Sequence, residues 1–206
     1  MLCRVTTPAG YEVGPDATVR ATQSALAELD GARGVVLVEG VSDQIAVDAA
    51  AQVIGVDLAG VVVMPIGGAH AIARALGDLD ARLVGDVPVA VLCDEREAPY
   101  VERALADSTR LGVRAFVCRA DLEDELIRAA GIDRLDALVA RVGDTAPFAR
   151  MSAQPAWSDE PHPARFRRFV GAGAGRKHRY AAAIPTVLGP DEIPAPLAAA
   201  IAHVSG

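Results

Sequence analysis

Short runs of apolar residues recur along the first part of the chain, and segments with helical spacing separate them. Each run has the length of one strand that is buried on both faces. The four runs are VVLVE at 35–39, VVVMPI at 61–66, VPVAVLC at 87–93 and VRAFVC at 113–118. The segments predicted as helices are 18–29, 43–54, 67–76, 99–112 and 122–131. Because strands that alternate with helices pair in parallel, the pattern predicts an α/β fold with a four-stranded parallel sheet flanked by helices.

The strand pattern stops after residue 131. The segments that follow, among them IDRLDALVARVG and PLAAAIAHV, have helical character and are separated by glycine and proline. A length of 206 residues suits one domain with an appendage. We predict three regions, which are a leader with the first helix (1–32), an α/β domain (33–131) and a small helical C-terminal segment (132–206).

Composition narrows the class of protein. Half of the residues are apolar and few are aromatic, so we expect an aliphatic core. No run of 18 apolar residues and no charged start before an apolar stretch is present, which predicts a cytoplasmic protein without a membrane span or secretory signal. The cysteines Cys3, Cys93 and Cys118 are odd in number, and two lie in apolar runs. We therefore expect reduced, buried thiols, and their spacing does not suggest zinc.

Positive charge is concentrated in one stretch, although the net charge of −7 argues against a general nucleic-acid coat protein. No acid lies between Pro161 and Pro190. The basic residues of this stretch are Arg165, Arg167, Arg168, Arg176, Lys177 and Arg179. Lys177 is the only lysine in the chain. Codon usage that favours arginine would explain why a single lysine remains. A site that needs a compact ammonium on a flexible side chain would explain it equally well.

Acidic residues follow three of the four predicted strands. They are Glu39 and Asp43 after the first strand, Asp94 and Glu97 after the third, and Asp121 and Glu123 after the fourth. Ligands of open α/β sheets bind at the carboxyl ends of the strands. Carboxylates brought together there repel one another, and Mg²⁺ or Mn²⁺ with its preference for oxygen ligands relieves the repulsion. A single acid at such a position also serves as a helix N-cap, which explains Asp43 equally well on its own.

Three segments together resemble a TOPRIM domain, the metal-binding fold shared by topoisomerases, primases and several nucleases. They are VVLVEGVSDQIAV, VVVMPIGG and VPVAVLCDEREA. In particular they resemble the TOPRIM half of the OLD (overcoming lysogenization defect) family nucleases. The Glu-Gly-x-x-Asp motif of that family is matched by Glu39, Gly40 and Asp43, and its glycine-rich turn by Gly67 and Gly68.

The resemblance implies a divalent-metal-dependent nuclease that hydrolyses or nicks nucleic acid, with DNA preferred to RNA as the substrate. It implies a site for two Mg²⁺ or Mn²⁺ ions, whose ligands would be Glu39, Asp43, Asp94, Glu97 and Glu123. Lys177 matches a lysine of the trailing helical segment and would neutralise charge that develops on the phosphate. Glu39 would act as a metal ligand or, alternatively, as a general acid or base.

The sequence departs from the family pattern in two ways. The second Asp of an Asp-x-Asp motif is replaced by Arg96. Either Glu97 supplies the missing carboxylate, or one of the two metal sites is weakened. The segment GAGAGRK does not satisfy the phosphate-loop pattern, because Arg176 precedes Lys177 and His178 follows it. We therefore expect a standalone form without the ATPase domain of OLD proteins. A separate chain would supply any control by ATP, and the resemblance also implies a homodimer.

Two alternatives to a nuclease remain open at this stage. One is a primase-like phosphotransferase that uses the same metal site. The other is a catalytically weak or inactive TOPRIM subunit that binds nucleic acid or a protein partner, which Arg96 would favour. The arginines near Lys177 are expected to hold the nucleic-acid backbone, or else to form a solvated helix face.

Overall fold

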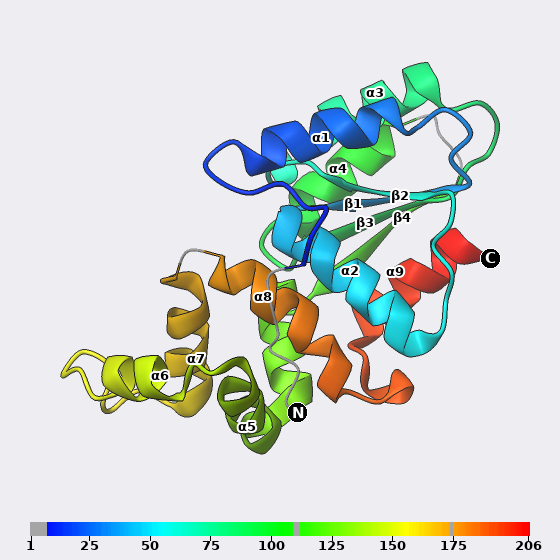
Figure 1. The fold of residues 1–206 in the computed structure, drawn as a ribbon. Helices are drawn as coiled ribbons and strands as arrows, with labels where there is room; N and C mark the ends of the chain where they lie inside the picture. Colours follow the sequence, from blue (N-terminus) through cyan, green and yellow to red (C-terminus); the bar gives the residue numbers. More distant parts are fainter. Residues whose placement is uncertain (1–7, 109–111, 174) are drawn as a thin grey trace.

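The computed structural model describes residues 8–108, 112–173 and 175–206, and Cys3 lies outside them. The strands are β1 (Gly34–Val38), β2 (Val61–Pro65), β3 (Val89–Asp94) and β4 (Val113–Cys118). The α-helices are α1 (Ala17–Ala27), α2 (Val41–Ile54), α3 (Ile72–Arg82), α4 (Ala98–Asp107), α5 (Leu122–Val142), α6 (Thr145–Ser152), α7 (His162–Gly171), α8 (Arg176–Ala183) and α9 (Ala195–Ser205). Short 3-10 helices are η1 (Ala69–Ala71), η2 (Pro185–Val187) and η3 (Pro190–Glu192). Figure 1 shows their arrangement.

The four strands form one parallel sheet in the order β2-β1-β3-β4, which confirms the predicted fold class. In the central pair, Val36 of β1 lies opposite Ala90 of β3. At the end of the sheet, Asp94 of β3 lies opposite Cys118 of β4. The carboxyl ends of β1, β3 and β4 therefore meet at one edge of the sheet, where the acidic residues follow the strands.

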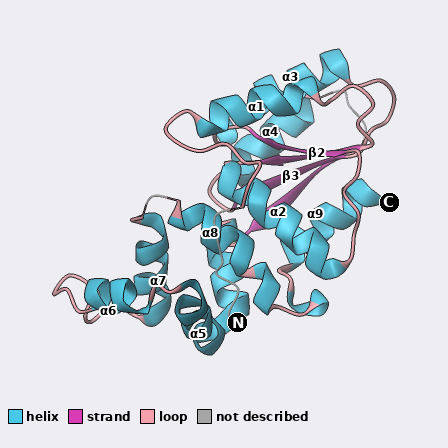
Figure 2. Ribbon diagram, viewed as in Figure 1, coloured by secondary structure: helices cyan, strands magenta, loops and turns pink. Residues whose placement is uncertain are grey.

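Helices cover both faces of the sheet. One face packs against α1, α3 and α4, and the other against α2 and α9 (Figures 1 and 2). Within β1, Val35 and Leu37 belong to the first of these cores, whereas Val36 and Val38 belong to the second. Because both sides of the strand are buried, the sequence shows a continuous apolar run instead of an alternating one.

The helical C-terminal segment returns to the sheet. α9 packs against β1, β3 and β4 beside α2, while α8 lies along α2. The chain passes through the expected junction at residues 131 and 132 within α5, where Gly131 (φ 70°) interrupts the helical backbone. The C-terminal segment thus supplies one wall of the same core, and α8 brings Lys177 to the carboxyl end of the sheet.

Two further expectations concern cysteines and membranes. Cys93 and Cys118 are buried free thiols, as the sequence predicts. Within the described ranges, none of the helices combines the length and the apolar character that crossing a bilayer requires.

Candidate metal centre

A pocket of about 420 Å³, including its open mouth, lies at the carboxyl ends of β1, β3 and β4. Its lining residues are Glu39, Asp43, Leu92, Cys93, Asp94, Glu97, Cys118, Asp121, Leu122, Glu123 and Lys177. All six residues predicted for the site therefore line one pocket, although they come from four separate parts of the sequence. Asp121 also lines it and is not among the predicted ligands. Like the other acids, Asp121 lies in the connection between a strand and the next helix, and this position was the sequence signal that it belongs to the pocket.

The turn from β1 into α2 places Glu39 and Asp43. Glu39 follows the last residue of β1, and its carbonyl accepts a hydrogen bond from the Gly67 N–H at 2.9 Å. Asp43 lies in the first turn of α2, where its Oδ2 accepts a hydrogen bond from the Gly40 N–H at 2.9 Å. The N-cap of α2 is therefore Gly40 and not Asp43, which reaches back to it from the third helical position. Asp43 also lines the pocket.

The turn from β3 into α4 places Asp94 and Glu97. Asp94 ends β3, and its Oδ1 accepts a hydrogen bond from the Glu97 N–H at 2.7 Å. The Oε1 of Glu97 accepts a hydrogen bond from the Ala69 N–H at 3.0 Å. Arg96 is exposed and does not contribute to the pocket lining. Beside Asp94, this turn therefore contributes the carboxylate of Glu97 to the pocket lining.

The glycine-rich turn after β2 holds these two strand ends together. Gly67 and Gly68 have φ values of 82° and 103°, a backbone region that disfavours side chains. A Cβ at Gly68 would lie 3.6 Å from the Glu97 carboxylate. Through Gly67 the turn binds the Glu39 backbone, and through Ala69 it binds the Glu97 side chain. The two glycines are therefore needed for the backbone path that positions both acids.

The N-terminus of α5 contributes Asp121 and Glu123. The Oδ1 of Asp121 accepts a hydrogen bond from the Asp124 N–H at 2.7 Å and caps the helix. Its Oδ2 accepts a hydrogen bond from Arg167 of α7. Glu123 lies in the first turn of the helix, where a negative charge is favourable.

Lys177 is held at the pocket by the residues on either side of it in α8. Asp144 is buried (8% exposed) and accepts hydrogen bonds from Arg179 and from the Tyr180 hydroxyl, both at 3.3 Å. The Nε of Arg176 lies 3.6 Å from the same Asp144 oxygen. Asp144 therefore anchors the start of α8, a role that its position after a helix-ending glycine did not reveal.

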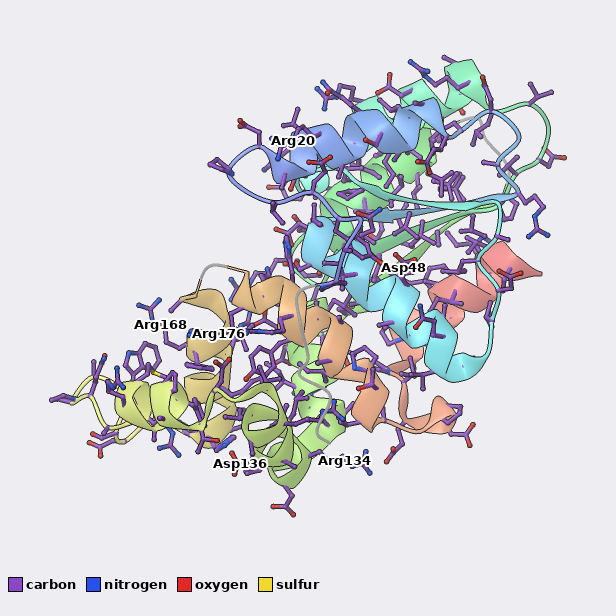
Figure 3. All side chains as sticks on the ribbon, in the orientation of Figure 1. Arg20, Asp48, Arg134, Asp136, Arg168 and Arg176 are labelled. Carbon is purple, nitrogen blue, oxygen red and sulfur yellow. The ribbon has the colours of Figure 1, made fainter. Side chains whose placement is uncertain are left out.

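This anchoring corrects the expectation for two of the arginines. Arg176 and Arg179 do not form a free grip for the nucleic-acid backbone, because both are partly buried and paired with Asp144. The Arg176 guanidinium also lies 3.7 Å from the centroid of the Phe169 ring and donates a hydrogen bond to the Phe169 carbonyl. Arg167 and Arg168 are exposed on α7 (Arg168 is labelled in Figure 3).

Three carboxyl groups of the pocket, those of Glu39, Asp43 and Glu123, have raised pKa values. Burial raises the pKa of Glu39, and repulsion by Glu97 raises it further, while Lys177 opposes the shift. Burial raises the pKa of Asp43 to about 6, against the attraction of Lys177. Burial also raises the pKa of Glu123. Buried acids that repel one another are stabilised by a cation, so this electrostatic environment fits a divalent metal ion.

The carboxylates of the pocket provide oxygen donors for a metal ion. Within residues 8–108, 112–173 and 175–206, no three acidic, histidine or cysteine side chains already converge as a metal-binding group. Asp43, Asp94 and Glu97 each direct one carboxylate oxygen to a backbone N–H. Because a carboxylate has two oxygens with about four lone-pair sites, these bonds leave room for coordination. Oxygen donors of this kind suit Mg²⁺ or Mn²⁺.

Comparison with known proteins agrees with this geometry. Residues 32–95 match the family model of the overcoming lysogenization defect protein-like TOPRIM domain. The matched region contains Glu39, Asp43 and Asp94, whereas Glu97, Glu123 and Lys177 lie beyond it. A search among curated proteins found no match.

Solved structures with the same fold can be aligned with most of the chain. The C-terminal region of the Burkholderia pseudomallei OLD protein has 20% sequence identity and a TM-score of 0.61, and the match covers 84% of this chain and 96% of that one. The C-terminal region of the Xanthomonas campestris pv. campestris OLD protein has 23% identity and a TM-score of 0.57, with 84% and 92% covered. Residues 32–95 of this chain therefore match an OLD-like TOPRIM domain, and the chain has the fold of OLD C-terminal regions.

Proposed function

We propose that this chain is a divalent-metal-dependent nuclease that hydrolyses or nicks DNA. The observation that carries the proposal is the pocket at the end of the sheet. There, carboxylates from the ends of β1, β3 and β4 meet the only lysine of the chain. Acidic oxygens beside one flexible ammonium suit the chemistry of a phosphodiester, which needs positive charge around a negatively charged reacting group.

Five acidic residues of the pocket would hold the cations. They are Glu39, Asp43, Asp94, Glu97 and Glu123. A divalent cation bound there supplies positive charge to the phosphate oxygens. Asp121 lies in the same lining but shares its carboxylate with Arg167 and the α5 backbone. We therefore assign Asp121 to positioning the first turn of α5 and not to binding the metal.

Lys177 and Glu39 would act on the substrate. Lys177 is exposed at the pocket, and its positive charge offsets part of the rise in the pKa values of Glu39, Asp43 and Glu123. The ammonium would stabilise the additional negative charge on the phosphate as the bond to the leaving oxygen breaks. Burial raises the pKa of Glu39, so this carboxyl holds a proton more firmly than an exposed one, which suits a group that transfers a proton.

Nicking of supercoiled plasmid tests the proposal. The wild-type protein is expected to nick in Mg²⁺ or Mn²⁺ and to stop when a chelator is added. Glu39→Gln is expected to lose nicking, whereas Glu102→Gln, which removes an exposed acid of α4, retains it. If the folded wild-type protein leaves the plasmid intact in every divalent metal, the nuclease proposal fails.

A second candidate is a TOPRIM subunit that binds nucleic acid without cutting it. It is favoured by one observation, which is that no ready-made cluster of three metal ligands is found in the described part of the chain. Such a subunit would shift the mobility of DNA without changing its topology in any metal. The same plasmid experiment therefore separates the two candidates.

A further inference from the structure

A basic arm extends from the helices that surround the pocket. It consists of α6, α7 and the turn between them, residues 145–171, and we call these residues the arm. They pack against α5 and α8 and project away from the sheet (Figure 1). The arm carries four arginines against the two acids Asp159 and Glu160, although the whole chain has a net charge of −7. This local excess of positive charge fits a polyanion.

Within the arm, Arg168 and Trp157 form a cation–π pair. The guanidinium carbon of Arg168 lies 5.6 Å from the centroid of the Trp157 ring. Arg168 is exposed, and Trp157 is only partly buried. Base stacking on an aromatic ring combined with a nearby guanidinium is a common way to bind single-stranded nucleic acid without reading its sequence.

Arg167 connects the arm to the pocket. It precedes Arg168 on α7 and is paired with Asp121, which lines the pocket. The Arg167 side chain remains 45% exposed. Since a guanidinium has five N–H donors, Arg167 can keep Asp121 and still donate to a phosphate. Two successive residues of α7 thus contact Trp157 on one side and the pocket residue Asp121 on the other.

We propose that the arm binds a single strand of nucleic acid, with one base stacked on Trp157 and adjacent phosphates held by Arg168 and Arg167. A base within a duplex is stacked on its neighbours, so an aromatic platform favours an unpaired strand. Asp159 and Glu160 follow Trp157 in the turn between α6 and α7 and would repel phosphates. The strand therefore approaches along α7 and not over this turn. The inference rests on the proposed function and specifies its substrate, which is a single strand or an unpaired segment of a duplex.

The fluorescence of Trp157 provides a direct test, because it is the only tryptophan in the chain. The Glu39→Gln protein is titrated with a short oligothymidylate, with a duplex of the same length and with inorganic polyphosphate. The oligothymidylate is expected to quench the fluorescence in a saturable way, because its bases stack on the indole. Polyphosphate binds the arginines but has no bases, so it leaves the fluorescence nearly unchanged. Quenching by polyphosphate equal to that by the oligonucleotide overturns the inference.

Variants separate stacking from charge. Trp157→Ala is expected to weaken binding of a labelled oligothymidylate about tenfold, whereas Trp157→Phe keeps most of the affinity. Arg168→Ala is expected to weaken binding and to reduce the salt dependence by about one phosphate contact. Arg103→Ala removes an exposed arginine from α4, on the other side of the sheet, and serves as the matched control. Wild-type affinity in a folded Trp157→Ala protein, or equal effects of Arg168→Ala and Arg103→Ala, contradict the inference.

These measurements do not depend on cleavage. If the oligonucleotide quenches the fluorescence of Glu39→Gln but the wild-type protein nicks no plasmid in any divalent metal, the arm is supported and the nuclease proposal fails. If the wild-type protein nicks plasmid but the oligonucleotide does not quench the fluorescence, the nuclease proposal stands and the inference about the arm fails.

Discussion

The carboxylate of Glu97 accepts a hydrogen bond from the backbone N–H of Ala69 at 3.0 Å. Ala69 opens the 3-10 helix η1 after β2, while Glu97 follows β3, and β1 lies between these two strands in the sheet. The bond therefore joins two turns across the strand that carries Glu39. It places the Glu97 carboxylate in the pocket although the Asp of the family pattern is replaced by Arg96.

Changes at Glu97 should separate its structural and electrostatic roles. Glu97→Gln keeps an oxygen for the Ala69 N–H but removes the charge, so we expect nearly unchanged stability and about tenfold weaker Mn²⁺ binding. Glu97→Ala also leaves the Ala69 N–H without its partner and is expected to lower the free energy of unfolding by about 1 kcal/mol more. Calorimetry and urea unfolding measure the two effects. Glu95→Gln, an exposed neighbour, is the control, and equal Mn²⁺ affinities of the Glu95 and Glu97 variants contradict a role in the metal site.

Asp43 is expected to make stability dependent on pH when no metal is present. Its folded pKa of about 6 lies above the ordinary value, because burial disfavours the charged form. The stabilising contribution of this group is therefore fully present below about pH 4 and is lost as the pH rises through about 6. Asp43→Asn does not titrate, and the amide oxygen can still accept the Gly40 hydrogen bond. In chelator at about pH 7 this variant should be more stable than the wild type by up to about 3 kcal/mol.

The advantage of Asp43→Asn should fall below about 1 kcal/mol near pH 4, where the folded carboxyl is protonated and the unfolded one is about half protonated. Denaturant unfolding at the two pH values measures it. Asp133→Asn, at an exposed position of α5, should show no such dependence. A variant that is less stable than the wild type at neutral pH would show that the fold favours the charged form of Asp43.

Asp144 should control the stability of α8 and, through it, the position of Lys177. Asp144→Ala leaves Arg176 and Arg179 partly buried without their carboxylate, so we expect a loss of about 3 kcal/mol of stability. Asp136→Ala breaks only an exposed contact with His162 and should cost less than about 1 kcal/mol. Figure 3 labels Asp136 and Arg176. Thermal unfolding of the two variants checks the difference, and equal losses would remove Asp144 as the anchor.

Lys177 should affect cleavage more than metal binding. Lys177→Met is expected to reduce the nicking rate by about 10²-fold or more, the usual effect of removing one charge-stabilising group. Lys177→Arg should not restore it, because a planar guanidinium cannot replace a compact ammonium. Mn²⁺ should still bind to both variants. Nicking at the wild-type rate in Lys177→Met, as in the control Arg103→Met, would attribute the lone lysine to codon usage.

β1, β2 and β3 were predictable because they are mostly buried and continuously apolar. The edge strand β4 leaves Arg114 and Val117 exposed, so it was recognisable mainly from the alternation of strands with helices. Since the predicted strands were expected to be parallel, the acids that follow them could be assigned to one edge of the sheet. The sequence did not predict that Arg176 and Arg179 pair with Asp144, since this contact joins residues more than 30 positions apart in the chain. Asp121 was recognisable as an acid after β4, but its bond to Arg167 depends on how α7 packs on α5. Local pattern thus indicated the pocket, and only the packing of the C-terminal helices showed which charges are free to act.

The most direct test of the metal centre is a calorimetric titration of the wild-type protein and Asp94→Asn with Mn²⁺. Asp94 ends the central strand β3 and lines the pocket. We expect saturable binding to the wild type, with a stoichiometry of about two if the complete two-metal site forms. We expect weaker or partial binding to Asp94→Asn. Absence of Mn²⁺ binding in a folded wild-type protein would contradict the assignment of this pocket as a metal centre.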